Sequence, residues 1–300
     1  MVKVLITGIN GFIGRNLADA LYQRGIYKID GLGRSDYCNI KIKNYFSIDI
    51  SNFGELKKIE NHYDIIFHCA GSANVPQSVR NPYFDFKSNM IGTFNMLEFA
   101  RLTKSGTFIY LSSVSVFDTN NKLPLTENSK KVPSSPYGAS KNSSENFCIA
   151  FHKTFNMDIR IARIFNTYGP DCKNLFIHDF ISKINGSSSK ILLLGSGNQT
   201  RDYIYISDLV NGIILIAESG GSGEDYNICS GNPLKIKNIA SIILSELKIL
   251  DKKIIFDKKH YPGDIEHWYG DNNKITSLGF KPTITFEDGI KKIILNMELR

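Results

Sequence analysis

Cysteine is scarce in this chain, and the way it is spaced excludes several classes of protein. Five cysteines occur among 300 residues, with no C-x-x-C pair and no histidine at the spacing of a zinc ligand. Scattered thiols of this kind predict a reduced, cytoplasmic protein that holds neither a structural zinc nor another metal.

Long apolar runs and blocks of charge are missing as well. No run approaches the roughly 20 residues that a membrane-spanning helix needs, and the start, MVKVLITG, reaches a glycine too early for a signal peptide. The net charge of +7 comes from scattered lysine pairs rather than from a basic tract. We therefore expect no membrane segment and no nucleic-acid binding, while a modest positive field suits an anionic small substrate.

What the sequence does contain is an alternation of short β-rich runs and longer amphipathic segments. Such alternation predicts βαβ units, with helices that pack on both faces of a parallel sheet. In the first half, strands are expected at 2–6, 28–32, 44–48, 64–68, 107–111 and 157–164, and helices at 12–24, 52–61, 82–103 and 137–155.

The second half is less regular, and glycines mark its turns. We expect helices near 174–185, 207–219, 235–249 and 286–296, and strands at 190–194, 203–206 and 226–228. The whole pattern predicts an α/β fold, in which a doubly wound parallel (Rossmann) sheet is followed by a smaller C-terminal α/β domain.

A glycine-rich loop, TGINGFIG, joins the first predicted strand to the first predicted helix. Gly8 permits the tight turn, Gly11 lets a pyrophosphate approach the backbone, and Gly14 lets the helix pack close to the sheet. The helix start at Phe12 and Ile13 offers unpaired N–H groups and a positive dipole end. This loop predicts dinucleotide binding.

The end of the second predicted strand indicates which dinucleotide is bound. A protein that reads NAD places an acid there for the adenosine ribose hydroxyls, whereas this chain has Arg34 and Ser35 after Gly33. Asp30 lies too early and Asp36 too late for that role. An arginine and a hydroxyl suit a 2′-phosphate, which favours NADP(H) and leaves NAD(H) as the alternative; Arg34 could also be a solvated loop residue.

Tyr137 and Lys141 in SPYGASK are four residues apart, so that on a helix they lie on one face, one turn apart. The small residues between them leave room for a bulky molecule. A nearby cation favours the phenolate form that a tyrosine needs to act as a base near neutral pH. On this motif alone, an ordinary capped helix is the alternative.

Taken in order, the motifs of this chain resemble those of the extended short-chain dehydrogenase/reductases that act on nucleotide sugars as epimerases, dehydratases or 4-ketoreductases. The resemblance spans essentially the whole chain. The matching segments are TGINGFIG (7–14), HCAG (68–71), YLSSVSVF (110–117), SPYGASK (135–141), RIFNTYGP (163–170), QTRDYIYISDLV (199–210), YNICSGNPLKI (226–236) and PGDIEHW (262–268).

The resemblance implies two domains and a catalytic set. Residues 1–170, with a returning segment at about 203–230, would bind the dinucleotide, and about 171–202 with 231–300 would bind a nucleotide-diphosphate sugar. Tyr137 would be the acid/base, Lys141 would also bond the nicotinamide ribose, and Ser113 would bond the reacting oxygen. If the register of the predicted strand differed by one residue, Ser112 and not Ser113 would bond the reacting oxygen. The implied cofactor-binding residues are Gly8, Gly11, Phe12, Ile13, Gly14, Arg34, Ser35, Asp49, Ile50, Ala70, Gly71, Tyr137, Lys141 and Ile164.

On the substrate side, the resemblance implies that Arg201 binds the diphosphate, for which its planar fork is suited. A salt bridge from Arg201 to Asp202 or Asp208 is the structural alternative. The implied substrate-contacting residues are Ser113, Asn166, Asn174, Leu175, Arg201 and Tyr261.

Two departures from the family pattern narrow the expected activity. Val114 and Ser115 stand where 4,6-dehydratases carry the Asp and Glu that eliminate water, so dehydration is not expected. Tyr261 replaces a common arginine, which leaves the sugar and the base of the nucleotide open. We expect an NADPH-dependent 4-keto-6-deoxy-sugar nucleotide reductase. The alternatives are a C4 epimerase with tightly bound NAD(H) and, in another class, an inactive dinucleotide-sensing or scaffold protein.

Two predicted helical segments, 84–100 and 137–155, are apolar over more than one stripe. A helix of this kind must bury a second face. We expect a two-fold homodimer in which these helices form a four-helix bundle, as in the resembled family. The alternative is that the second face is buried within its own chain.

Overall fold

The centre of the molecule is a seven-stranded sheet, seen in a computed structural model that describes residues 1–172, 176–186, 189–259 and 265–298. Its strand order is β10-β6-β5-β4-β1-β2-β3, and all neighbouring strands are parallel. The predicted doubly wound parallel sheet is therefore confirmed. The strands are β1 (Val2–Thr7), β2 (Tyr27–Gly33), β3 (Asn44–Ser47), β4 (Ile65–His68), β5 (Thr107–Ser113), β6 (Ile159–Ile164) and β10 (Asp225–Ile228).

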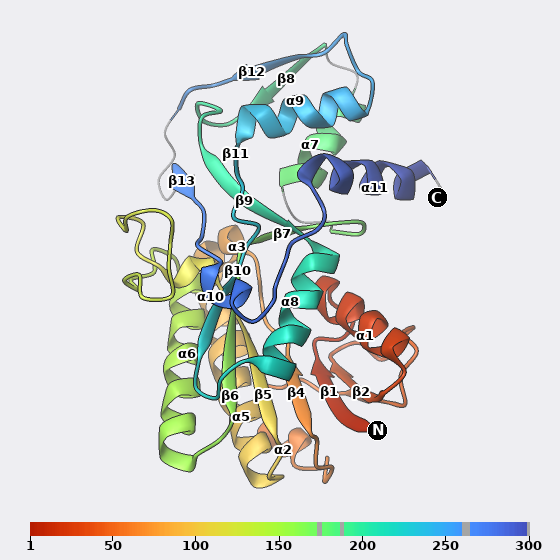
Figure 1. Cartoon of the computed structure of the whole chain (residues 1–300), viewed down its shortest axis with the longest axis vertical. Helices are drawn as coiled ribbons and strands as arrows, with labels where there is room; N and C mark the ends of the chain where they lie inside the picture. Colours follow the sequence, from red (N-terminus) through yellow and green to blue (C-terminus); the bar gives the residue numbers. More distant parts are fainter. Residues whose placement is uncertain (173–175, 187–188, 260–264, 299–300) are drawn as a thin grey trace.

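Helices cover both faces of this sheet, because successive side chains of a strand point to opposite sides. On β1, Val4 and Ile6 belong to one apolar core with residues of α1 and α8, whereas Leu5 belongs to a second core with residues of α5 and α6. Figure 1 shows these two pairs of helices on opposite sides of the sheet. Their bounds are α1 (Phe12–Arg24), α8 (Ile206–Ser219), α5 (Gly92–Leu102) and α6 (Pro136–Phe155).

A smaller α/β part lies above the large sheet in Figure 1. In it, β9 pairs with β7, β11 and β13, and β8 pairs with β12. The strand expected at 203–206 is β9, which begins earlier and belongs to this smaller sheet. The elements are β7 (Asn166–Tyr168), α7 (Phe176–Asn185), β8 (Lys190–Leu193), β9 (Thr200–Tyr205), β11 (Pro233–Lys235), α9 (Ile236–Glu246), β12 (Lys253–Phe256), β13 (His267–Trp268) and α11 (Phe286–Glu298). The short helix α10 (Asn273–Thr276) packs on β10 of the large sheet instead.

The helix expected over 52–61 is wrong beyond its first turn, since α2 covers only Phe53–Leu56. The Ile59 N–H donates to the Leu56 carbonyl at 3.0 Å, which makes a tighter turn than an α-helix does. Both Leu56 and Ile59 are buried in the core as a result. Burial of this apolar pair favours the tight turn over continued helix.

The helix expected over 82–103 is present but not uniform. It consists of α4 (Pro82–Asp85), a π-helical turn η1 (Phe86–Ile91) and α5. A separate helix, α3 (Val75–Arg80), precedes it and was not expected; the Asn74 side chain caps it by accepting a hydrogen bond from the Gln77 N–H at 2.9 Å. Wider turns of the π type occur often at functional sites.

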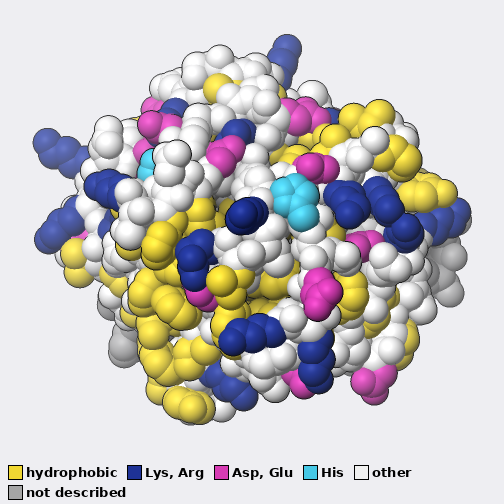
Figure 2. Space-filling model, turned by 90° about the horizontal axis from the view of Figure 1, so that it is seen from below, with side chains coloured by type: hydrophobic (Ala, Val, Ile, Leu, Met, Phe, Trp, Pro, Cys, Tyr) yellow, Lys and Arg dark blue, Asp and Glu magenta, His cyan; other side chains and the backbone are white. Residues whose placement is uncertain are grey.

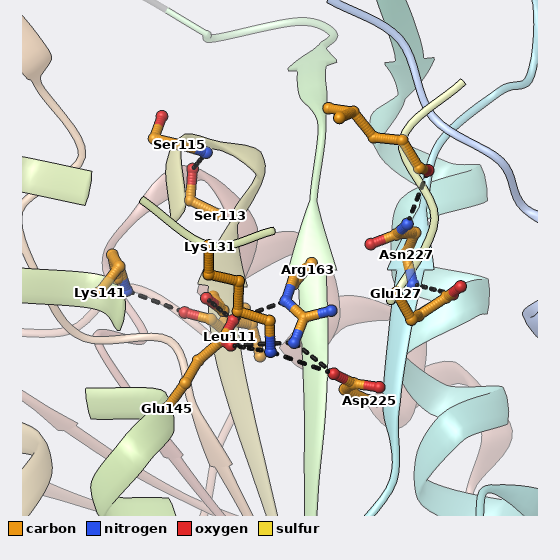
Figure 3. Close-up of polar contacts among 12 residues, drawn as sticks. Leu111, Ser113, Ser115, Glu127, Lys131, Lys141, Glu145, Arg163, Asp225 and Asn227 are labelled. Carbon is orange, nitrogen blue, oxygen red and sulfur yellow. Dashed lines mark hydrogen bonds and ion pairs between the residues drawn. The ribbon is translucent and has the colours of Figure 1, made fainter. Parts of the chain in front are cut away.

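A buried ionic cluster fastens α6 to the sheet. Arg163 on β6 donates to both carboxylate oxygens of Glu145 on α6, at 2.7 and 2.9 Å, and also bonds Asp225 on β10. The Lys131 ammonium lies 3.1 Å from Glu145. Figure 3 shows these four side chains converging between the strands and the helix. Burial would raise the pKa of Glu145, but Arg163 and Lys131 outweigh it and lower that pKa.

Replacing Arg163 by Met should lower the free energy of unfolding by about 3–5 kcal/mol, because Glu145 is left buried without its main partner. Urea denaturation at neutral pH measures this loss. The matched control is Arg24→Met, which breaks the half-exposed pair of Arg24 with Glu218; such a pair contributes about 1 kcal/mol or less. Equal losses in the two variants would show that the cluster does not anchor α6.

Candidate active site

The glycine loop after β1 has the close backbone packing that the sequence predicts for it. Gly8 has φ +67°, and a Cβ there would lie 2.7 Å from the Cα of Ala70. A Cβ at Gly14 would lie 2.4 Å from the Gly8 carbonyl oxygen. Gly11 is the N-cap of α1, and no side chain caps the helix there. The loop is therefore a backbone cradle at a helix start, which fits a pyrophosphate group.

A cleft of about 680 Å³ opens beside this loop, across the carboxyl ends of β1, β2 and β4. It continues along residues 48–51, which follow β3, and along residues of α4 and η1. Eight of the predicted cofactor-binding residues line it: Gly8, Gly11, Arg34, Ser35, Asp49, Ile50, Ala70 and Gly71. Nine lining residues were not predicted: Asn10, Leu32, Gly33, Ile48, Ser51, Cys69, Phe84, Lys87 and Ser88.

Six other predicted cofactor-binding residues do not line the cleft. Three of them open α1, two lie on α6, and one ends β6. The six are Phe12, Ile13, Gly14, Tyr137, Lys141 and Ile164. Their roles toward a cofactor remain proposals.

The end of the cleft at β2 has no carboxylate from that strand. Asp30 is buried and bonds the Asn44 side chain at 2.9 Å and the Tyr63 hydroxyl at 3.0 Å. A Cβ at Gly33 would lie 2.9 Å from the hydroxyl of Tyr45, which fills the space there. An acid at the tip of β2 therefore has neither a residue to carry it nor the room for one.

Two cations face this end of the cleft instead. The Arg34 guanidinium lies over the Phe84 ring, 5.6 Å from its centroid, and Lys87 of η1 lines the same cleft. Burial would raise the pKa of Asp49, but hydrogen bonds from Ser51 and the charges of Lys87 and Arg34 lower it. This end of the cleft therefore has two positive side chains, Arg34 and Lys87, and one ionised carboxylate, Asp49, which accepts hydrogen bonds from Ser51.

The three predicted catalytic residues lie close together and are nearly buried. Tyr137 and Lys141 occupy the first turns of α6, which begins at Pro136 after the Ser135 side chain caps it. Burial raises the pKa of Tyr137, and a hydrogen bond with Ser113 lowers it. The structure therefore brings a hydroxyl from the end of β5 against the tyrosine of α6.

Lys141 is a buried cation whose ammonium donates to the Leu111 carbonyl at 2.8 Å, as drawn in Figure 3. Burial lowers the pKa of Lys141 to about 8. Ser112 points away from this group and donates to Glu145 at 2.6 Å. The register of β5 therefore turns Ser113, and not Ser112, toward Tyr137.

On the predicted substrate side, Asn166 begins β7 and Arg201 lies on β9, beside it in the smaller sheet. Arg201 donates to the Thr200 carbonyl at 2.8 Å. Asp202 accepts from Ser230 and Gly231, and Asp208 accepts from Thr283 and Ile284. These carboxylates are thus engaged with other groups. Asn174, Leu175 and Tyr261 lie outside the described residues.

Within residues 1–172, 176–186, 189–259 and 265–298, no three or more His, Cys, Asp or Glu side chains come together as a metal site would require. In the same ranges, no helix combines the length and the apolar character needed to cross a membrane.

Comparison with known proteins identifies relatives over nearly the full chain. A protein of Methanocaldococcus jannaschii named "Putative UDP-glucose 4-epimerase" is 32% identical, over 97% of each chain. The "GDP-6-deoxy-D-mannose reductase" of Pseudomonas aeruginosa is 25% identical, over 99% of this chain and 98% of that one. The solved structure of "UDP-N-acetylglucosamine 4-epimerase from Methanobrevibacter ruminantium M1 in complex with UDP-N-acetylmuramic acid" has a TM-score of 0.90 and 27% identity, over 99% of this chain and 98% of that one.

The family model described as "NAD dependent epimerase/dehydratase family" matches residues 4–229. This range runs from β1 to the residue after β10 and so includes the glycine loop and the Ser113, Tyr137 and Lys141 group. The match therefore agrees with the fold and with the geometry of the site. The chain belongs to the NAD dependent epimerase/dehydratase family.

Proposed function

We propose that this protein is an NADPH-dependent reductase that acts on the C4 ketone of a 4-keto-6-deoxy-sugar nucleotide. The observation that carries the proposal is the end of the cleft at β2, where Arg34 and Lys87 face the cavity and Tyr45 occupies the space that an acid at position 33 would need. Such a site suits a 2′-phosphate. The similarity to a protein named GDP-6-deoxy-D-mannose reductase supports the same reading.

A nicotinamide dinucleotide, when bound, supplies the hydride that the ketone carbon receives. The residues of this chain would bind and orient the reactants and move the proton. Tyr137 would donate its hydroxyl proton to the oxygen that becomes an alkoxide, and Ser113 would hold that oxygen in place. Lys141, one turn away, would stabilise the phenolate that is left.

Dehydration receives no support from the residues at the site. Val114 and Ser115 form the short turn η2 (Val114–Val116) directly after Ser113. The valine has no ionisable group, and the Ser115 N–H bonds the Ser113 hydroxyl at 3.2 Å. Neither side chain can remove or return a proton at neutral pH in an elimination.

A C4 epimerase is the second candidate, and the names of two relatives support it. The relative from M. jannaschii and the structure from M. ruminantium both carry epimerase names. An epimerase would use the same Ser113, Tyr137 and Lys141 but would keep NAD(H) bound through both half-reactions. An inactive sensor or scaffold is a third alternative, which the intact catalytic set disfavours.

The substrate contacts that we propose are Asn166, Arg201 and Ser113. Arg201 and Asn166 lie on adjacent strands β9 and β7 of the smaller sheet, and Ser113 lies at the end of β5. A nucleotide-diphosphate sugar would then reach from the smaller part, which binds the diphosphate, to the catalytic group on the large sheet. In this arrangement α8 and β10, which follow β9 in the chain, belong to the dinucleotide-binding domain.

We further propose a two-fold dimer through α5 and α6. Phe94 is 40% exposed and Phe155 is 47% exposed, so that these helices present aromatic rings to solvent. Phe94 packs edge-on against Phe147 and Phe151, with ring centroids 5.3 and 5.7 Å apart. Figure 2 shows hydrophobic side chains gathered at the lower left of the face seen from below, on the side where α6 lies in Figure 1.

Replacing Tyr137 by Phe should reduce turnover by roughly two orders of magnitude or more, because the ring remains and only the proton-donating oxygen is lost. Initial rates with a 4-keto-6-deoxy-sugar nucleotide and NADPH measure the effect. Dinucleotide affinity should stay near that of the unmodified protein, since the cleft is unchanged. Near-normal turnover of the variant would contradict the assigned role of Tyr137.

The unmodified protein should bind NADPH at least about tenfold tighter than NADH. A charge-assisted hydrogen bond contributes on the order of 1.5–3 kcal/mol, and about 1.4 kcal/mol corresponds to a tenfold change in affinity. Fluorescence titration with each cofactor measures the preference. Arg34→Ala and Lys87→Ala should each reduce it, whereas Lys3→Ala, a change of equal charge outside the cleft, should not.

NADH binding as tight as NADPH binding in the unmodified protein would remove the main support for the reductase. A dinucleotide that copurifies and is released only on denaturation would also argue against the reductase. The C4 epimerase would then be the better proposal. Turnover of a nucleotide sugar at C4 without added cofactor would establish it.

Phe94→Glu should convert the dimer to monomer at micromolar concentration, because two charges would be buried at the proposed two-fold interface. Light scattering measures the mass. Leu250→Glu is the matched control, since Leu250 is 95% exposed and lies after α9 in the smaller part, so its replacement should leave the dimer intact. A monomeric unmodified protein would contradict the dimer.

A further inference from the structure

Asp85 is a buried carboxylate close to the catalytic tyrosine, and no motif in the sequence points to it. It ends α4 and has no exposed surface, whereas Tyr83 on the same helix and Phe86 directly after it are exposed. Helix α4 packs against α6, which carries Tyr137 and Lys141.

A chain of hydrogen bonds connects Asp85 to the first turn of α6. The Asn89 side-chain amide donates to the Asp85 carboxylate at 3.3 Å and to the Ser140 hydroxyl at 2.9 Å. The Ser140 hydroxyl in turn donates to the backbone carbonyl of Tyr137 at 2.7 Å. The side-chain oxygen Oδ1 of Asn89 accepts from the Ser72 N–H at 2.7 Å, which fixes the orientation of the amide. The place of the carboxylate relative to Tyr137 is thus set by packing and by hydrogen bonds.

The second oxygen of Asp85, Oδ2, is enclosed and has no hydrogen bond of ordinary geometry within the described residues. Burial raises the pKa of Asp85, while the Ser72 side chain and the charge of Lys141 lower it. A buried carboxylate acts on its neighbours more strongly than a solvated one does, because the surroundings have a lower dielectric. The negative charge of Asp85 accordingly raises the pKa of Tyr137.

The other charged groups around Tyr137 are paired or distant. Neither β5 nor η2, which pack on α6, contains a charged residue. On β6, Arg163 is bound by Glu145, as described above. Arg80 of α3 and Lys87 of η1, the charged residues of the other elements packed on α4, are exposed to solvent. Arg160 of β6 is paired with Asp158, and Arg101 of α5 is paired with Glu98. The charge that raises the pKa of Tyr137 is that of Asp85.

We propose that Asp85 is a positioning residue that keeps Tyr137 protonated before each turnover, so that the tyrosine serves as a proton donor in the reducing direction. The proposal rests on the proposed reductase function. During reduction the ketone carbon receives a hydride with its electron pair, and the carbonyl oxygen becomes an alkoxide. The Tyr137 O–H bond breaks, and its proton forms the new O–H bond of the sugar. A proton from solvent then restores the tyrosine.

Two effects follow from the negative charge of Asp85. It raises the free energy of the phenolate relative to the protonated tyrosine, so that the protonated form predominates between turnovers up to a higher pH. The same charge also works against oxidation of a sugar hydroxyl, because that direction must begin from the phenolate. The sign is consistent with the pKa of Tyr137, which burial raises most and which Asp85 raises further. Asp85 thereby extends the pH range over which Tyr137 is protonated and able to donate.

Replacing Asp85 by Asn removes the charge and keeps the shape. We expect the pKa of Tyr137, measured with saturating NADP⁺ bound, to fall by roughly one unit. The ultraviolet absorbance of tyrosinate is titrated against pH, and the same titration of Tyr137→Phe, alone and combined with Asp85→Asn, is subtracted to isolate the signal of Tyr137. The alkaline limb of the turnover profile should move to lower pH by the same amount.

Three further variants separate charge from structure. Asp85→Glu keeps the charge and should retain the titration of the unmodified protein, whereas a purely structural role predicts the opposite order of the Asn and Glu variants. Asp85→Ser provides a second neutral variant in case the Asn variant does not fold. Asp19→Asn, on the exposed face of α1, is the matched control and should change nothing.

An unchanged or raised pKa of Tyr137 in the neutral variants would overturn the proposal. The titration needs no turnover, so its result is independent of the proposed activity. If the pKa falls as expected but no ketone is reduced, the reductase function fails and the role of Asp85 in setting the protonation of Tyr137 stands.

Discussion

All strands of the large sheet run in one direction, and this constraint places the site. The carboxyl ends of β1, β2, β4, β5 and β6 meet at a single edge, so the residues that follow them converge although they are distant in the sequence. Gly8, Arg34, Ala70 and Ser113 come together in this way. The glycine loop can close on β4 only because its backbone approaches Ala70 without a side chain between them. The cleft is a consequence of strand direction and of that close approach.

The position of Tyr137 depends on an ion pair made by Glu145, about two turns further along α6. Glu145 on α6 bonds Arg163 on β6, and Arg163 also bonds Asp225 on β10. An ion pair of this kind tolerates little displacement, because a shift would leave buried charge unpaired. It sets α6 against the sheet, and through Ser112 it also holds the end of β5. The proximity of Ser113 to Tyr137 follows from these two attachments.

Features with a local cause could be predicted from the sequence, and features that arise from packing could not. The glycine loop, α1 and the start of α6 depend on glycine spacing, caps and periodicity within a few residues, and the structure has them where expected. The end of α2 depends instead on how Leu56 and Ile59 enter the core. Lys87 and Asp85 lie in a segment that the sequence marks only as an apolar helix. An aspartate within an apolar helical segment indicates a functional role, because burial of a charge costs free energy.

Two cations line the end of the cleft, whereas a buried carboxylate lies near Tyr137, and each has a separate consequence for the proposed reaction. Arg34 and Lys87 face the end of the cleft that would hold the adenosine ribose, where positive charge selects a phosphate. Asp85 lies directly before η1 in the chain, and its negative charge favours the protonated form of Tyr137. Both Lys87 and Asn89, which holds Asp85, belong to η1, so one wide turn of helix contributes to cofactor choice and to proton transfer. A ketone reductase requires a reduced nicotinamide cofactor and a proton donor, whereas an epimerase must also start from the phenolate.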